Sequence, residues 1–186
     1  MRVALRINPH IEVDTHKNIT TGSKGNKFGI EAEQAFALYQ QYSAHPCINI
    51  VGLAMHIGSQ LFDDVPYRSA IRKLLILTQR IQTSGGSIDN LDLGGGFGVS
   101  YESGEALDFE CIATVIAEET ADYQGNIFVE PGRSLVADIG LLISEVTYVK
   151  EADPRPFVIL DAAMNDLMRP ALYQAVHPTL TVKQSA

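Results

Sequence analysis

Residues 48–57, INIVGLAMHI, form an apolar run typical of a strand that is buried on both faces. Gly58 ends the run, and from Pro66 onward apolar side chains recur at helical spacing as far as residue 81. A buried strand followed by an amphipathic helix is the repeating unit of parallel α/β proteins. This stretch therefore predicts one strand–helix unit of an α/β fold.

The same unit recurs on both sides of this stretch. Apolar runs predict three more strands, at residues 3–7, 88–93 and 126–130. Helical spacing predicts two more helices, at residues 31–43 and 108–122. Four strands make either a small open sheet or half of an eight-stranded (β/α)8 barrel. We favour a partial TIM-type barrel of about four C-terminal βα units, because chemically useful motifs follow the strands.

The chain changes character after Pro131. Residues 135–150 and 155–163 are long, β-rich and separated by an Asp-Pro turn. No helical pattern lies between them, so we expect an antiparallel segment. We assign residues 1–136 to the barrel and residues 137–186 to the beginning of a C-terminal antiparallel β domain.

Composition and charge limit the possible functions. The 186 residues are 46% hydrophobic, but no apolar run approaches the ~18 residues of a membrane span. A net charge of −8 argues against a nucleic-acid partner, which needs a basic face. Two cysteines, Cys47 and Cys111, make neither a disulfide framework nor a metal site. We therefore expect a cytoplasmic protein with no membrane, nucleic-acid or metal partner.

Chemically useful residues follow three neighbouring strands of the predicted sheet. They are His56 and Ser59 after the second strand, Gly94–Gly96 after the third, and Glu130 and Arg133 after the fourth. The carboxyl ends of parallel strands form one rim in barrel enzymes, so we expect these residues to converge.

The glycine cluster, GGGFG at residues 94–98, allows two interpretations. A tight turn after the strand would need glycine for positive φ angles. Three successive glycines also allow backbone N–H groups to close around an anion. The GxGxxG spacing of dinucleotide sites is absent, so we favour a cradle for a small phosphate monoester.

His56 and Glu130 extend the phosphate interpretation. A histidine on an apolar strand is either a satisfied core residue or a flat partner for a heteroaromatic ring. A glutamate at the end of an apolar strand is expected to be buried and to need a cation, either Arg133 or a protonated ring nitrogen. A phosphate cradle, a ring partner and a carboxylate for a pyridinium together describe pyridoxal phosphate.

Several motifs resemble one family of enzymes. The segments are INPHIEVDTHKNITTGSKGNKFGI (7–30), GLAMHIGSQ (52–60), LDLGGGFGVSY (91–101), EPGRSLV (130–136) and LDAAMNDLMRPALY (160–173). Together they are similar to diaminopimelate decarboxylases, which belong to the alanine-racemase-like, fold type III pyridoxal phosphate enzymes. GGGFG and EPGR occur across the wider decarboxylase family, whereas HIGSQ and RPALY point to diaminopimelate.

The resemblance implies two groups of site residues. The cofactor-binding group is His56, Ser59, Gly94, Gly95, Gly96, Glu130, Gly132 and Arg133. The substrate-binding group is Arg133, Arg169 and Tyr173. The glycines and the serine would hold the phosphate, the histidine would pack on the pyridine ring, and the glutamate would bond the ring nitrogen. Guanidinium forks suit the carboxylates of a substrate with two amino-acid ends.

Two elements of the family's active site have no match in the sequence. The resemblance implies a Schiff-base lysine upstream of the chain and a cysteine-containing segment beyond Ala186 that completes the site across a dimer interface. Lys17, Lys24 and Lys27 lie in the first long loop and do not match the family's lysine. We therefore expect an incomplete fragment that is inactive alone and supplies no catalytic residue itself.

The resemblance also implies an activity. The full-length enzyme would be a homodimeric carboxy-lyase that converts meso-2,6-diaminopimelate to L-lysine and CO2 in lysine biosynthesis. One alternative is a related decarboxylase acting on ornithine, arginine, lysine or carboxynorspermidine. The other is a non-catalytic relative that binds a decarboxylase subunit or the cofactor without turnover.

Overall fold

The computed structural model describes residues 1–11, 27–101 and 107–182 of the chain. The chain divides into two compact units. The first comprises Met1–Val99 and Glu105–Leu135, and the second comprises Ser100–Gly104 and Val136–Ala186. Each unit contains its own sheet.

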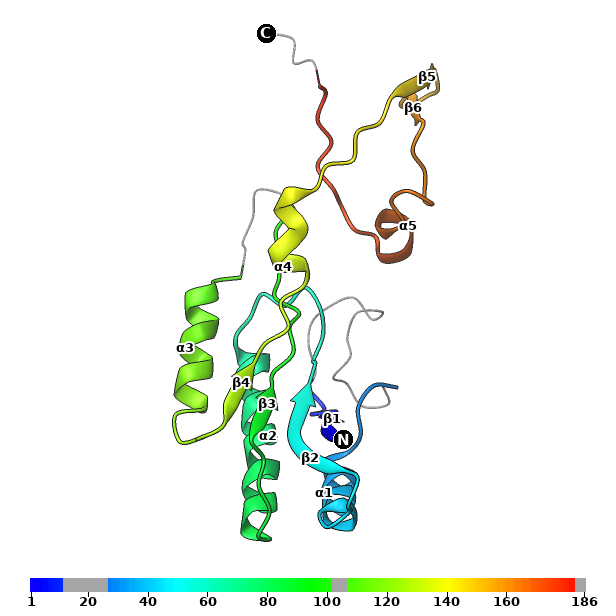
Figure 1. Cartoon of the computed structure of the whole chain (residues 1–186). Helices are drawn as coiled ribbons and strands as arrows, with labels where there is room; N and C mark the ends of the chain where they lie inside the picture. Colours follow the sequence, from blue (N-terminus) through cyan, green and yellow to red (C-terminus); the bar gives the residue numbers. More distant parts are fainter. Residues whose placement is uncertain (12–26, 102–106, 183–186) are drawn as a thin grey trace. The chain divides into compact units, whose positions relative to one another are not determined.

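The first unit is built on a parallel sheet with the strand order β1-β2-β3-β4 (Figure 1). The strands are β1 (Arg2–Ile7), β2 (Asn49–Met55), β3 (Asn90–Asp92) and β4 (Asn126–Phe128). Leu53 of β2 lies opposite Leu5 of β1 and Leu91 of β3. Strands adjacent in sequence are adjacent in the sheet and run in one direction, which confirms the predicted partial α/β barrel.

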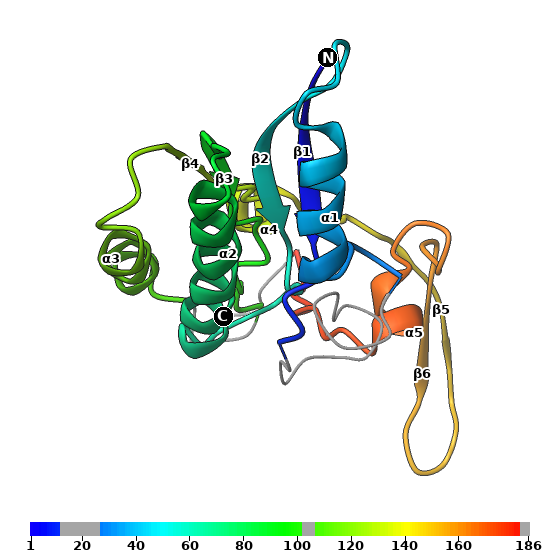
Figure 2. The same cartoon turned by 90° about the horizontal axis from the view of Figure 1, so that it is seen from below.

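Three helices accompany these strands. They are α1 (Ala32–Tyr42), α2 (Val65–Thr83) and α3 (Phe109–Glu119). α1 and α2 pack against the sheet and against each other, and α3 packs on α2 (Figures 1 and 2). Each predicted helix is present, with both ends within three residues of the predicted ones.

Local sequence signals fix the ends of these helices. Pro66 lies in the first turn of α2, where its missing N–H costs no hydrogen bond. Gly85 adopts a φ of 87° just after the helix. Asp108 caps α3, because its Oδ1 accepts hydrogen bonds from the N–H groups of Glu110 and Cys111 at 2.9 and 3.3 Å. The helices therefore end where the chain must turn back to the sheet.

The core of the first unit lies between the sheet and the helices. The buried residues of α2 form one stripe along the helix: Tyr67, Ala70, Ile71, Leu74, Leu77, Thr78 and Ile81. Leu53 and Leu91 of the central strands are 0% exposed and belong to the same cluster. Burying one such leucine contributes about 1.5–3 kcal/mol, so the central strands and α2 anchor the sheet that carries the site.

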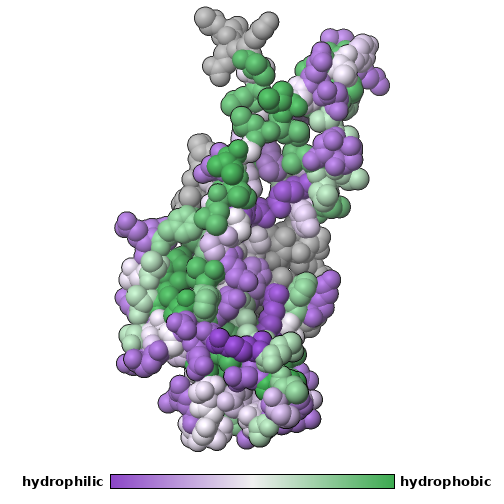
Figure 3. All heavy atoms as spheres, viewed as in Figure 1, coloured by the Kyte–Doolittle hydropathy of each residue, from purple (hydrophilic) through white to green (hydrophobic). Residues whose placement is uncertain are grey.

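The helices leave the other face of the sheet uncovered. Arg6, Ala54, Asp92 and Phe128 share one register row across the four strands. Arg6 and Phe128 are exposed in that row. Figure 3 accordingly shows polar and apolar atoms beside one another over this unit. The open face thus places two opposite charges, Arg6 and Asp92, close to the carboxyl ends of the strands.

α2 also holds the loops that follow two other strands. The Tyr67 hydroxyl donates a 3.1 Å hydrogen bond to the carbonyl oxygen of Gly95, after β3. The Lys73 ammonium donates to the carbonyl oxygens of Pro9 and His10, after β1, at 2.7 and 3.1 Å. Burial raises the pKa of Tyr67 well above its ordinary value, so its hydroxyl remains a donor. One helix therefore fixes two loops at the carboxyl edge of the sheet.

The second unit contains an antiparallel pair, β5 (Val146–Lys150) and β6 (Phe157–Leu160), followed by α5 (Arg169–Tyr173). Val149 lies opposite Val158, and the connection contains a cis Asp153–Pro154 bond. The predicted antiparallel segment with its Asp-Pro turn is therefore confirmed. All side chains of the two strands are exposed.

The strand after the barrel begins later than predicted. The apolar stretch from residue 135 starts in α4 (Arg133–Val136) and continues in a short 3-10 helix (Ala137–Ile139). The N–H of Leu135 bonds the carbonyl oxygen of Gly132 at 3.1 Å. No strand among the described residues pairs with residues 133–139, so the backbone there forms local hydrogen bonds instead.

Candidate functional site

Loops that follow neighbouring strands meet at the carboxyl edge of the sheet. The N–H of Glu130, after β4, donates to the carbonyl oxygen of Gly94, after β3, at 2.7 Å. The Nη2 of Arg133, also after β4, donates to the hydroxyl of Ser59, after β2, at 3.2 Å. The residues that the sequence expects to converge therefore lie together, in what we call the strand-end cluster: His56, Ser59, Gly94–Gly96, Glu130 and Arg133.

The three amides of the glycine cluster are not equivalent. The Gly94 amide donates to Oδ1 of Asp92 at 2.9 Å, and the Gly95 amide donates to Nδ1 of His56 at 3.3 Å. The Gly96 amide has no acceptor within residues 1–11, 27–101 and 107–182. Two of the three groups expected to bind a phosphate are thus used inside the protein, and of the three it is Gly96 that offers its amide to an anion.

The cluster needs glycine for close packing as well as for its turn. A Cβ atom on Gly95 would collide with the carbonyl oxygen of Glu130. Gly96 has a φ of 93°, and a Cβ atom there would collide with the carbonyl oxygen of Gly58. The turn and the cradle are therefore one arrangement, since the same turn that needs glycine leaves the Gly96 amide available.

His56 is held as a neutral ring with its proton on Nε2. Its Nδ1 accepts the Gly95 amide and so carries no proton. Burial lowers the pKa of His56 most, and the positive charge of Arg6 lowers it further, against the opposing charges of Glu130 and Asp92. A flat, neutral, half-buried ring is suited to stacking against an aromatic ligand.

The lowered pKa of His56 predicts a pH dependence of stability. The unfolded chain takes up a proton near pH 6.5 and the folded chain does so only at lower pH, so the free energy of unfolding falls as the pH drops below about 6.5 and levels off above it. His56→Asn should reduce this slope while keeping an acceptor for Gly95. Urea unfolding at about pH 5.5 and about pH 7.5 measures the slope. His45→Asn is the control. A slope in His56→Asn that is no smaller than the slope in the control would contradict the prediction.

Ser59 and Arg133 form a site suited to an anion. While Nη2 of Arg133 bonds Ser59, its Nη1 is buried and has no hydrogen-bond partner in the described part of the chain. A buried guanidinium nitrogen without an acceptor is costly unless an anion occupies that position. Gly96 lies against Gly58, the residue before Ser59, so its backbone is next to the same site. These donors fit a phosphate group.

Glu130 differs from the prediction of a buried carboxylate. Its side chain is exposed and forms no ion pair with Arg133 among the described residues. The reason is that Glu130 follows β4, which lies at the edge of the sheet, and the helices cover only one face of that sheet. Its charge nevertheless acts on the pKa of His56. Gly132 is also exposed, with open space where a side chain would lie.

The remaining substrate-binding candidates lie in the second unit. Arg169 and Tyr173 begin and end α5, and the guanidinium lies 5.3 Å from the centre of the Tyr173 ring. Nε of Arg169 is buried and lacks a hydrogen-bond partner among the described residues. Arg169 is therefore half-buried with a donor to spare, as a carboxylate-binding arginine would be.

The lysines and cysteines considered from the sequence have no assigned role in the cluster. Lys17 and Lys24 lie outside the described residues. Lys27 is exposed, with its ammonium 5.1 Å from the centre of a phenylalanine ring. Cys47 and Cys111 are exposed and free.

Two other kinds of feature are absent from the described residues. They contain no group of three His, Cys, Asp or Glu side chains that could hold a metal ion. No helix within the same ranges has both the length and the apolar character needed to cross a membrane.

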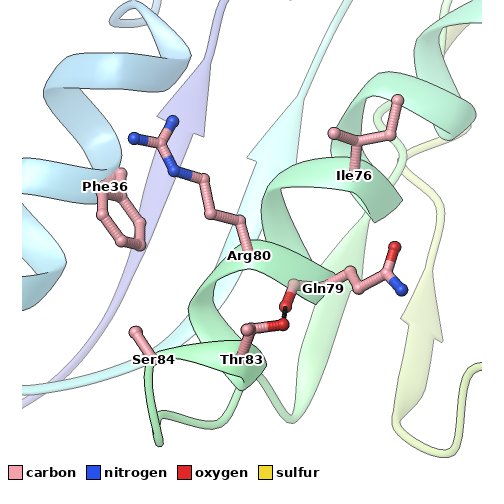
Figure 4. Close-up of a pocket in the computed structure, with 6 residues that line it drawn as sticks. All are labelled: Phe36, Ile76, Gln79, Arg80, Thr83 and Ser84. Atoms are coloured by element: carbon pink, nitrogen blue, oxygen red, sulfur yellow. Dashed lines mark hydrogen bonds between the residues drawn. The ribbon is translucent and has the colours of Figure 1, made fainter.

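A separate shallow hollow of about 480 Å³ lies between α1 and α2 (Figure 4). It is lined by Phe36, Ile76, Gln79, Arg80, Thr83 and Ser84. Arg80 lies over the Phe36 ring at 4.0 Å and pairs with Glu33. The last turns of α2 lead into the start of β3 and so lie at the amino ends of the strands. The hollow is therefore remote from the strand-end cluster.

The sequence alone does not identify three residues that support the cluster: Gln60, Tyr67 and Asp92. Asp92 had a usable signal, since an aspartate two residues before a glycine is typical of a side chain-to-backbone turn. Tyr67 lies inside a predicted helix and Gln60 ends the HIGSQ motif, but the sequence assigns neither residue a role in the cluster. Their hydrogen-bond partners are set by the tertiary structure.

Comparison with known proteins agrees with this geometry. A family model described as "Pyridoxal-dependent decarboxylase, pyridoxal binding domain" matches residues 1–137. The chain is 42% identical to a diaminopimelate decarboxylase of Zymomonas mobilis over 186 residues, which cover 99% of this chain and 44% of the relative.

Solved structures give the same result. Diaminopimelate decarboxylase from Helicobacter pylori, complexed with L-lysine, matches with a TM-score of 0.94 at 38% identity, over 99% of this chain and 46% of that chain. The lysine/ornithine decarboxylase of Vibrio vulnificus, complexed with cadaverine, has a TM-score of 0.82 over 100% of this chain and 46% of that one. Its identity is 23%, so it shows a shared fold.

The chain therefore belongs to the pyridoxal-dependent decarboxylase family, and the resemblance inferred from its motifs is confirmed. It spans less than half the length of the curated relatives it matches. The matched pyridoxal-binding domain includes the whole strand-end cluster, from His56 to Arg133. The donors of that cluster fit the phosphate of the family's cofactor, pyridoxal phosphate.

Proposed function

We propose that the strand-end cluster is the cofactor site of a diaminopimelate decarboxylase, a carboxy-lyase that converts meso-2,6-diaminopimelate to L-lysine and CO2 in lysine biosynthesis. The observation that carries the proposal is the anion site, where Ser59, the Gly96 amide and the unpaired Nη1 of Arg133 lie beside the neutral ring of His56. The 42% identity to a diaminopimelate decarboxylase along nearly the whole chain supports the choice of substrate.

Each residue of the cluster has a distinct part in holding the cofactor. Ser59, Gly96 and Arg133 would bind the phosphate, His56 would lie on the ring, and Glu130 would bond the ring nitrogen. When bound, pyridoxal phosphate supplies a conjugated ring that takes up the electrons left when the substrate loses its carboxylate. An exposed Glu130 on an open sheet face is accessible to such a ring.

The other glycines of the motifs act indirectly. Gly94 and Gly95 would shape the cradle through their internal bonds to Asp92 and His56, rather than by donating to the phosphate. Gly132 would leave room for the cofactor, because its surroundings are open.

Arg133, Arg169 and Tyr173 are the residues proposed for substrate binding. Arg169 has a buried guanidinium nitrogen, Nε, without a partner among the described residues. A substrate with two amino-acid ends has two carboxylates to pair with such groups. Tyr173, beside Arg169, would support that arginine through its ring.

The proposal extends to the organisation of the protein. We assign residues 1–136 to the C-terminal half of a cofactor-binding barrel and residues 137–186 to the beginning of a β domain. The exposed apolar side chains of β5 and β6 favour burial against further protein, such as the partner subunit of a homodimer. The free thiols of Cys47 and Cys111 are suited to a reducing cytoplasm.

A substrate panel tests the proposed function. We expect the protein, in the form that its host cell makes and supplied with pyridoxal phosphate, to release CO2 from meso-2,6-diaminopimelate and to form L-lysine. Rates with L-ornithine, L-arginine and L-lysine should be lower by a factor of about 100 or more, because they leave a carboxylate-binding arginine unpaired. Intact mass after borohydride reduction would show whether one phosphopyridoxyl group is attached, and peptide masses would identify the lysine that carries it.

Each other outcome of the panel has a definite meaning. Faster turnover of ornithine, arginine or lysine would replace the proposal by the related decarboxylase. Cofactor binding without turnover of any of these amino acids would indicate the non-catalytic relative. Failure to bind pyridoxal phosphate would overturn the assignment of the site.

A further inference from the structure

Besides the bond from the Gly95 amide to His56, four hydrogen bonds join the loops that follow β2 and β3. Leu61 donates its N–H to the carbonyl oxygen of Gly96 at 3.0 Å and accepts the N–H of Gly98 at 2.9 Å. The other two bonds come from one side chain. Nε2 of Gln60 donates to the carbonyl oxygen of Val99, and Oε1 of Gln60 accepts the Val99 N–H, both at 2.9 Å.

The Gln60 side chain thus pairs with the backbone of Val99 as a neighbouring strand would, and we call this pair the clamp. A primary amide has one donor end and one acceptor end, and Val99 offers the complementary pair. Flipping the amide would oppose donor to donor and acceptor to acceptor, so Val99 fixes its orientation. Gln60 also adopts a φ of 61°, a left-handed conformation that is uncommon for residues other than glycine. The clamp is specific in both geometry and chemistry.

The clamp lies next to the donors of the anion site. Gln60 directly follows Ser59, and Val99 is three residues after Gly96. The loop after β2 supplies the hydroxyl of Ser59, and the loop after β3 supplies the amide of Gly96. Their relative position decides whether both can reach one phosphate group, because each hydrogen bond tolerates only a few tenths of an ångström.

We propose that Gln60 is a positioning residue, which sets the Ser59 hydroxyl and the Gly96 amide at the spacing that one phosphate monoester requires. This inference rests on the proposed function of the site and adds a residue to it. Gln60 acts through the two loops and does not itself need to contact the cofactor. Its loss should therefore weaken recognition of the phosphate and leave recognition of the ring intact.

The test uses two ligands that differ only in the phosphate, pyridoxine 5′-phosphate and pyridoxine. Neither has an aldehyde, so neither forms a bond to a lysine, and calorimetric titration of the natively expressed protein measures both dissociation constants. The variant Gln60→Asn tolerates the positive φ but is one methylene too short to span the gap. We expect its dissociation constant for pyridoxine 5′-phosphate to rise about tenfold, with that for pyridoxine changed less than about twofold.

Two further variants separate positioning from general support of the fold. Gln60→Met keeps the length of the side chain and removes both hydrogen bonds, so it should behave like Gln60→Asn. Gln174→Asn is the matched control, since Gln174 is exposed and has a φ of 54°. The control should bind both ligands as the unchanged protein does.

The outcomes distinguish the inference from the proposed function. If the unchanged protein prefers the phosphate ester and Gln60→Asn or Gln60→Met weakens both ligands equally, Gln60 has a structural role and the inference is wrong. An unaltered preference in both variants would overturn it as well. If the unchanged protein shows no preference for the phosphate ester, the anion site itself is wrong, and the proposed function fails with it.

Discussion

Replacing Gly95 with valine is expected to lower the affinity for pyridoxal phosphate by about 100-fold and the free energy of unfolding by about 3 kcal/mol. The new side chain would collide with the carbonyl oxygen of Glu130, at the end of β4. The collision would separate the loops after β3 and β4, which the hydrogen bond from Glu130 to Gly94 now joins. It would also break the bonds that Gly95 makes to His56 and Tyr67.

Absorbance titration with pyridoxal phosphate and urea unfolding would measure the two effects of Gly95→Val. The matched control is Gly140→Val, because Gly140 has open space around it and an ordinary negative φ. The control should change neither quantity by much. Full cofactor affinity in Gly95→Val would show that the cluster is only a turn.

Glu130→Gln is expected to reduce decarboxylation of meso-2,6-diaminopimelate by about 100-fold with little loss of stability. The reason is that a nearby opposite charge favours a protonated ring nitrogen by about 1–3 pKa units, and a neutral amide does not. The side chain is exposed and forms no ion pair with another described side chain, so its replacement breaks no ion pair. Rates of CO2 release from the natively expressed protein would measure the effect.

Exposed Glu110 offers the control for this substitution, since Glu110→Gln removes the same charge from α3. That variant should retain the activity of the unchanged protein. Activity in Glu130→Gln within about twofold of the control would remove Glu130 from the site.

The sequence predicts those parts of the fold and site that depend on order along the chain. Strand–helix alternation determines a parallel sheet, and a parallel sheet brings all strand ends to one edge. His56, Ser59 and Arg133 could therefore be placed together without any knowledge of their contacts. Helical spacing of apolar residues located the helices, and Pro66 marked the start of one of them.

The sequence does not predict features that depend on a distant partner. It cannot show that His56 takes up the Gly95 amide, since that bond exists only once β2 and β3 are adjacent. The exposure of Glu130 depends on which face the helices cover. The late start of β5 has the same origin, because an apolar stretch becomes a strand only where another strand pairs with it.

The two attachments of α2 restrict how the chain can change its length. Tyr67 and Lys73 hold loops after different strands, and the helix keeps them about 9 Å apart along its axis. A single residue inserted between them would rotate Lys73 by about 100° and release the loop after β1. Insertions and deletions should therefore be absent from this part of α2 in related chains, while the connection around Gly85, with nothing near its Cβ position, can vary in length.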